Sequence, residues 1–391
     1  MPGLAKRMAR LGTEGAFEVL ARARSLEALG RRIVHLEIGE PDFETAPHIK
    51  AAAVEALDAG YTHYGPSAGL QPARQAVARY VARTRGLEVS PEQVVITPGA
   101  KPILFFTIMA VVDEGDEVIV PDPGFPIYES VVEFAGATPV SLPLLEARRF
   151  RFDARYLHRL ITPRTRLIIL NSPQNPTGGV LTLEDLQAVA EVARERDLWV
   201  LSDEIYSRLL YEGEHHSIAT LPGMAERTIV LDGFSKTYAM TGWRLGYGVA
   251  PAALVPQLTR LQTNVTSCTA SMIQMAGIAA LDGPQDGVAA MLDEFHTRRS
   301  LVVDGLNQIE GVHCLAPGGA FYVFPRVDVP GRTSKEVADS LLDREGVAVL
   351  AGTAFGRHGE GFLRLSFANS RSELEEGLAR LKAGIDRLRR G

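Results

Sequence analysis

Cysteine, lysine and asparagine are scarce in this chain of 391 residues, and long apolar runs are missing. Cys268 and Cys314 are the only cysteines. Two cysteines are too few for a disulfide framework or a cysteine-based zinc site, so we expect a reducing compartment and no metal. No stretch approaches the ~20 apolar residues of a membrane span, and the first residues lack the apolar segment of a signal peptide. These absences predict a cytoplasmic protein without a membrane partner.

The net charge of the chain is also small. The 41 Lys and Arg residues and the 47 Asp and Glu residues leave a charge of −6, without blocks of like charge. We therefore expect no nucleic acid partner. Only six of the basic residues are lysines, so a lysine in an unusual setting stands out.

From about residue 48, short apolar segments alternate with helical patterns. The expected strands are 94–97, 117–120, 167–170, 199–202, 228–231 and 245–249. Continuous apolar strands between helices indicate an α/β fold with a mainly parallel sheet sandwiched by helices. After residue 285 the pattern changes to a long Arg-rich helix followed by mixed elements. We expect a large domain over 48–285 and a smaller α+β domain formed by 1–47 and 286–391.

Polar residues follow several of these expected strands, and ligands of such sheets bind at the carboxyl ends of the strands. After 94–97, the turn Pro98-Gly-Ala-Lys-Pro102 opens a helix whose free N–H groups could bind a phosphate. After 167–170, a loop with two prolines and two glycines presents Asn175. The alternative for both segments is an ordinary turn.

Asp203 ends the apolar segment 199–202, with Tyr206 three residues further on. An acid beside a buried strand needs a partner, which could also be an arginine or a helix N-terminus. Lys236 follows segment 228–231 in a loop rich in small residues. A desolvated lysine near another cation has a lowered pKa and can react with a carbonyl group. The alternative is a surface lysine. The apolar segment 228–231 that precedes Lys236 argues against this alternative.

Together these motifs resemble the fold-type-I pyridoxal-phosphate aminotransferases of class I/II, the aspartate aminotransferase-like group. The likeness is carried by Asn-x-Pro-x-Asn-Pro-Thr-Gly, Ser-Asp-Glu-Ile-Tyr and Ser-Lys-Thr-Tyr-Ala-Met-Thr-Gly-Trp-Arg, in this order. It extends from Ile38-Gly-Glu-Pro-Asp-Phe43 to Arg364-Leu-Ser-Phe-Ala368 and so covers nearly the whole chain.

The resemblance implies pyridoxal 5'-phosphate as the cofactor and gives each residue a role. Lys236 would bind the cofactor covalently and then move the proton of the reaction. Asp203 would pair with the ring nitrogen, and Tyr206 and Asn175 would bind the phenolic oxygen. Phe125 would stack on the ring.

The resemblance also implies a phosphate site. Backbone N–H groups of Ala100 and Lys101 would bind it, beside Ser235 and Arg244. Tyr64 matches a tyrosine that reaches the phosphate of the neighbouring subunit, which implies a homodimer.

Four residues are implied in substrate binding. Arg364 would bind the α-carboxylate together with Asn175. The backbone of Gly39 would close over this carboxylate. By strand alternation alone, Arg364 shares a face with Ser366 and would be interpreted as solvated. Lys101 stands where one branch of the family recognises a dicarboxylate; the alternative is that it lies near the phosphate or in solvent. The segment 261–268, where another branch has an arginine for this task, contains none.

We therefore predict transfer of an amino group between an amino acid, with aspartate as the leading choice, and a 2-oxo acid such as 2-oxoglutarate, by a ping-pong mechanism. Alternatives are a C–S lyase or eliminase of the same fold, and an aminotransferase for aromatic or other apolar amino acids. A non-catalytic regulator of this fold would carry a DNA-binding domain, for which the length leaves no room. A nicotinamide oxidoreductase would need Gly-x-Gly-x-x-Gly after a strand, which is absent.

Overall fold

The structure is a computed structural model that describes residues 3–390. Its centre is a seven-stranded sheet in the order β2-β8-β7-β6-β5-β3-β4. The strands are β2 (Val94–Thr97), β3 (Glu117–Asp122), β4 (Thr138–Pro143), β5 (Thr165–Asn171), β6 (Trp199–Asp203), β7 (Thr228–Gly233) and β8 (Gly246–Val249). Strands β3 to β7 pair in parallel, and β8 runs antiparallel to β2 and β7. The predicted α/β fold with a mainly parallel sheet is confirmed.

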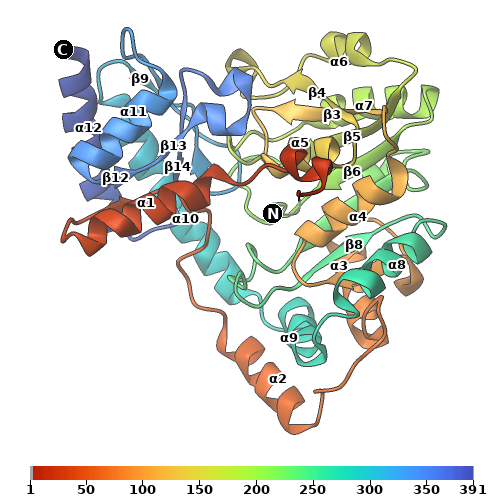
Figure 1. Ribbon diagram of the computed structural model, residues 1–391. Helices are drawn as coiled ribbons and strands as arrows, with labels where there is room; N and C mark the ends of the chain where they lie inside the picture. Colours follow the sequence, from red (N-terminus) through yellow and green to blue (C-terminus); the bar gives the residue numbers. More distant parts are fainter. Residues whose placement is uncertain (1–2, 391) are drawn as a thin grey trace.

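Helices cover both faces of this sheet (Figure 1). They are α2 (Pro47–Asp58), α3 (Gln71–Arg85), α4 (Lys101–Val111), α5 (Ile127–Phe134), α6 (Ala154–Leu160), α7 (Leu183–Glu195), α8 (Val255–Thr266) and α9 (Ser271–Asp282). Successive residues of β2 belong to different apolar clusters, because side chains alternate across a strand. Ile96 packs in the cluster of α2, α3 and α9, and Val95 packs in that of α4 and α8. This strand is therefore buried on both of its faces.

A second group of elements joins the two ends of the chain. Its strands are β1 (Val34–His35), β9 (Val312–His313), β10 (Tyr322–Val323), β11 (Arg326–Val327), β12 (Val347–Ala348), β13 (Leu350–Ala351) and β14 (Leu363–Ser366), and its helices are α1 (Gly15–Ala28), α10 (Asp286–Asn307), α11 (Ser334–Ser340) and α12 (Arg371–Arg390). They pack around Phe295, Phe321 and Phe367. Figure 1 shows α1 beside α11, and Arg22 of α1 pairs with Asp339 of α11.

A short 3-10 helix, η1 (Lys6–Arg10), precedes α1 and lies against α5. Gly12 donates its backbone N–H to Ser130 Oγ at 2.9 Å, which fixes this segment to α5. The N-terminal segment thus reaches from the second group of elements across to the large sheet. None of the helices in the described part of the chain is long and apolar enough to cross a bilayer.

Candidate active site

A cavity of about 510 Å³ lies at the carboxyl ends of the central strands. Residues of the large sheet, of the second group and of the N-terminal segment all contribute to its walls. The residues expected from the sequence that line it are Gly39, Ala100, Lys101, Phe125, Asn175, Asp203, Tyr206, Ser235, Lys236, Arg244 and Arg364. Tyr64 lies outside this cavity, and its side chain is 90% exposed.

Lys236 lies three residues beyond β7, with its amine inside the cavity. Nζ donates to the backbone oxygen of Gly39 at 2.5 Å and lies 5.7 Å from the ring of Phe321. Burial lowers the pKa of Lys236 to about 8, although the negative charge of Glu40 acts against this shift. The neutral amine, which a nucleophile or base requires, is therefore far more populated near neutral pH than in an ordinary lysine.

Asp203 ends β6 and is 7% exposed. Tyr128 donates its hydroxyl to Oδ2 at 2.7 Å, and the backbone N–H of Ile205 donates to Oδ1 at 3.2 Å. Burial raises the pKa of Asp203 to about 7 even though both hydrogen bonds act in the opposite direction. A buried carboxylate of this kind is stabilised by a cation, and the protonated ring nitrogen of a pyridine fits that requirement.

The turn between β2 and α4 depends on two glycines. Gly99 has φ +84°, and a Cβ there would lie 2.2 Å from Nη2 of Arg244. A Cβ on Gly246 would lie 2.4 Å from the backbone nitrogen of Ala100. Without side chains at these positions, the guanidinium and the first N–H groups of α4 come together beside Ser235. This cradle of donors fits a phosphate group.

Arg364 projects from β14 and is only 3% exposed. Nη1 donates to Asn175 Oδ1 at 3.3 Å, and Nη2 donates to the backbone oxygen of Glu37. Burial lowers its pKa. Within residues 3–390 its Nε has no acceptor and its charge has no carboxylate partner. The interpretation of this arginine as solvated was wrong, because β14 is buried on both faces.

Two tyrosines complete this wall of the cavity. The hydroxyl groups of Tyr206 and Tyr322 lie 2.9 Å apart, and burial raises the pKa of both. The guanidinium carbon of Arg364 lies 4.6 Å from the centroid of the Tyr322 ring. A Cβ on Gly39 would meet the Tyr322 hydroxyl at 1.9 Å, so only glycine lets this backbone close over the site.

Sequence reasoning missed Tyr128 and Tyr322, which both line the cavity; the N-terminal segment 13–17 was expected near its mouth, and Glu14 of that segment lines the cavity as well. Tyr128 lies at the start of α5, three residues after Phe125, and that spacing was the one available signal. Tyr322 lies in the segment Gly-Gly-Ala-Phe-Tyr, whose small residues signal a close backbone approach. Glu14 contacts Lys101 from the N-terminal segment, and no local pattern indicates that contact.

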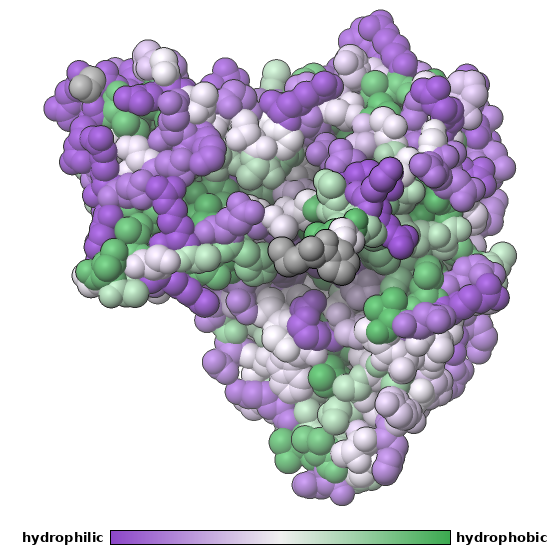
Figure 2. Space-filling model, viewed as in Figure 1, coloured by the Kyte–Doolittle hydropathy of each residue, from purple (hydrophilic) through white to green (hydrophobic). Residues whose placement is uncertain are grey.

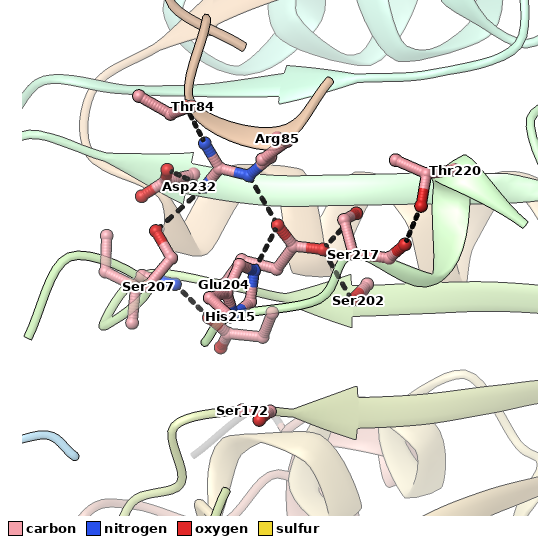
Figure 3. A network of polar contacts seen from close by, with 12 residues as sticks. Thr84, Arg85, Ser172, Ser202, Glu204, Ser207, His215, Ser217, Thr220 and Asp232 are labelled. Atoms are coloured by element: carbon pink, nitrogen blue, oxygen red, sulfur yellow. Dashed lines mark hydrogen bonds and ion pairs between the residues drawn. The ribbon is translucent and has the colours of Figure 1, made fainter. Parts of the chain in front are cut away.

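A buried polar network lies beneath the strand ends (Figure 3). Arg85, at the end of α3, donates to Glu204 at 2.6 Å and to Asp232. Glu204 also accepts from Ser217 at 2.6 Å and lies 3.0 Å from His215 Nε2. Burial raises the pKa of Glu204, but His215 and Arg85 outweigh this effect and hold it at about 2. The network therefore ties the end of β6, which carries Asp203, to the end of β7, which leads to Lys236.

The chain was compared with known proteins. The family model "Aminotransferase class I and II" matches residues 31–381. An aspartate aminotransferase of Pyrococcus abyssi and an aromatic-amino-acid aminotransferase of Thermococcus litoralis are each 42% identical over 90% of this chain and 91% of their own. The crystal structure of the aspartate aminotransferase from Rhizobium meliloti superposes with a TM-score of 0.94 at 37% identity, covering 99% of this chain and 100% of that one.

These matches agree with the geometry of the cavity. A desolvated lysine, a buried aspartate and a phosphate cradle meet in this one cavity, a set of groups that fits pyridoxal phosphate. The chain therefore belongs to the class I and II aminotransferases, the pyridoxal-phosphate enzymes that transfer an amino group.

Proposed function

We propose that the protein transfers the amino group of an amino acid to 2-oxoglutarate by a ping-pong mechanism, in the cytoplasm. The observation that carries this proposal is that a single cavity collects Lys236, Asp203 and Arg364. These residues supply an amine, a buried acid and an unpaired guanidinium. The free cysteines, Cys268 and Cys314, suit a reducing compartment.

The cavity residues divide into those that bind the cofactor and those that move the proton. When bound, pyridoxal phosphate withdraws electrons from the α-carbon of the amino acid. Nζ of Lys236 would take the proton from the α-carbon of the amino acid and return it later in the same half-reaction. Asp203 keeps the ring nitrogen protonated. Asn175 and Tyr206 donate hydrogen bonds to the phenolic oxygen, and Phe125 stacks on the ring.

The phosphate site extends beyond one chain in this proposal. Backbone N–H groups of Ala100 and Lys101 bind the phosphate with Ser235 and Arg244, and Tyr64 of a second copy completes the site. The exposed side chains near Tyr64 support a homodimer. Val54 is 56% exposed, Leu57 46% and Tyr61 38%, and Figure 2 shows apolar surface at the lower tip of the molecule, over α2. Apolar surface of this kind favours contact with another protein.

The α-carboxylate of the substrate binds to Arg364, beside Asn175 and the backbone of Gly39. A buried guanidinium without a carboxylate partner favours an anion at this position. The side chain of the substrate points towards Lys101 and Phe125, and towards Phe17 of α1, which also lines the cavity. Relatives named for aspartate and for aromatic amino acids are equally similar to this chain. We therefore propose aspartate or an aromatic amino acid as the amino donor.

A panel of amino donors assayed with 2-oxoglutarate tests the proposal. We expect glutamate formation with aspartate or with an aromatic amino acid. The purified protein should be yellow, and Lys236→Ala should lose both the absorption band and the activity. An unchanged spectrum in Lys236→Ala would refute the role of this lysine. Release of pyruvate from cysteine-type substrates without an acceptor would instead indicate an eliminase.

A further inference from the structure

Glu14 places a carboxylate in the wall of the cavity, on Lys101, towards which the proposed function directs the substrate side chain. It immediately precedes α1, and its side chain is 17% exposed. Its Oε1 accepts a hydrogen bond from Nζ of Lys101, the first residue of α4. Nζ of Lys101 also lies 5.4 Å from the centroid of the Phe125 ring. The ammonium group of Lys101 is therefore already paired with Glu14. A second carboxylate of a substrate would need the same ammonium group.

The other charged groups of this cavity already have tasks. Lys236, Asp203, Arg244 and Arg364 bind the cofactor or the α-carboxylate in the proposed function, and Glu40 accepts a hydrogen bond from the hydroxyl of Thr241. Glu14 has no such task. Burial lowers the pKa of Lys236, and the charge of Glu14 is among those that act against this lowering, so Glu14 influences the reacting end of the cavity.

We propose that Glu14 is a displaceable internal carboxylate that lets one cavity accept both apolar and dicarboxylic substrates. With an apolar substrate, Glu14 stays on Lys101 and neutralises it. With a dicarboxylate, the distal carboxylate of the substrate replaces Glu14 on Lys101. This inference rests on the proposed function, in which an amino donor and 2-oxoglutarate use the same cavity in turn.

Electrostatics favour such an exchange over a fixed charge. If Lys101 were unpaired, an apolar side chain would desolvate a lone cation, which is costly. If Lys101 were held permanently by an acid, a dicarboxylate would meet a like charge. A carboxylate that moves aside avoids both penalties.

The structure also makes the exchange easy. The side chain of Lys101 is 49% exposed, and ion pairs of that exposure are weak. The backbone of the N-terminal segment is held separately, by the hydrogen bond that the N–H of Gly12 donates to Ser130 Oγ. Glu14 can therefore leave Lys101 by rotation of its own side chain while the segment stays in place.

The test measures binding to the holoenzyme of two substrate-like acids that cannot react. Maleate represents a dicarboxylate, and 3-phenylpropanoate represents an apolar monocarboxylate. The dissociation constants are measured by absorbance titration at fixed ionic strength for the wild type, Glu14→Gln and Glu18→Gln. Glu18 lies four residues further along the same segment, is exposed, and lies outside the cavity. Glu18→Gln removes the same charge as Glu14→Gln and is therefore the matched control.

In Glu14→Gln we expect maleate to bind more tightly and 3-phenylpropanoate more weakly. The ratio of the two dissociation constants should shift by about two- to fivefold towards the dicarboxylate, the size expected for a weak ion pair. Glu18→Gln should leave the ratio unchanged. In a Lys101→Met background, the shift caused by Glu14→Gln should become smaller, because no ammonium group is left for the two carboxylates to compete for; only their like-charge repulsion remains.

A shift below about twofold, an equal shift in Glu18→Gln, or a shift of undiminished size in Lys101→Met would overturn the inference. These outcomes are separate from a failure of the proposed function, because binding is measured without turnover. The proposed function fails if no amino donor reacts with 2-oxoglutarate. The inference can fail while transamination is present.

Discussion

At the scale of single residues, the ionisation of Asp203 depends on a neighbour. Asp203 binds a ring nitrogen only as an anion, yet burial raises its pKa to about 7. The Tyr128 hydroxyl, at 2.7 Å, stabilises the charged form. Tyr128 is therefore a positioning residue that keeps Asp203 ionised at neutral pH.

Tyr128→Phe tests this role through the pH profile. Loss of a hydrogen bond to the charged form raises the pKa of Asp203 further, so the ionised fraction falls most on the acid side. We expect kcat/KM to fall by about tenfold at pH 6 and to recover towards the wild-type value at pH 9. Steady-state kinetics over this pH range measure the effect.

The control for Tyr128→Phe is Tyr156→Phe, which removes the hydroxyl of a tyrosine that is 44% exposed on α6. It should match the wild type at every pH. A loss in Tyr128→Phe that is the same at all pH values would show that Tyr128 acts only through packing.

Residue contacts of this kind are the part of the site that the sequence does not predict. Lys236 and Asp203 follow buried strands, so their position at the sheet edge follows from the pattern. Tyr128 and Asp203 are 75 residues apart, and Glu14 and Lys101 are 87 apart. No local pattern connects such pairs, because only the packing of α5 and of the N-terminal segment brings them together.

At the scale of elements, the strand ends that carry the site are joined by Arg85. The side chains of Arg85 and Glu204 are each 1% exposed, and that of Asp232 is 3% exposed. One guanidinium thus compensates two buried carboxylates, one after β6 and one in β7. Its removal leaves Asp232 without a cation, and Glu204 with His215 as its remaining ion-pair partner, in a low-dielectric environment.

Arg85→Met should therefore lower the free energy of unfolding by about 3–5 kcal/mol, measured by urea denaturation. Adding Glu204→Gln and Asp232→Asn should recover part of the loss, since the uncompensated charges are then removed. Arg79→Met is the control on the same helix. Arg79 pairs with Asp282 at side-chain exposures of 55% and 36%, so its loss should stay below about 1 kcal/mol. Equal losses in both variants would contradict this account of the network.

The elements themselves follow the sequence closely where they are buried. All six predicted strand segments overlap strands of the large sheet, because each is a short, continuous apolar run. The sequence does not predict β4. This strand lies at the sheet edge, begins at an exposed Thr138 and contains Pro139 and Pro143. Edge strands tolerate proline and one solvated face, so the apolar run is lost there.

At the scale of the whole molecule, the site is incomplete without a second copy if Tyr64 acts across a dimer. The side chain of Tyr64 is 90% exposed and lies outside the cavity of its own chain. In a two-fold dimer, each active site would combine Lys236 of one chain with Tyr64 of the other. This arrangement predicts that two defective chains can restore one intact site.

The experiment mixes Lys236→Ala with Tyr64→Ala, allows subunits to exchange, and assays without added cofactor. In a mixed dimer, the site with the intact Lys236 receives the intact Tyr64 of the partner. Random exchange makes half of the dimers mixed, so we expect about a quarter of the wild-type activity. If Tyr64 served its own chain, every site would lack one of the two residues and mixing would restore nothing. Activity that stays at the sum of the separate variants would therefore exclude a shared site.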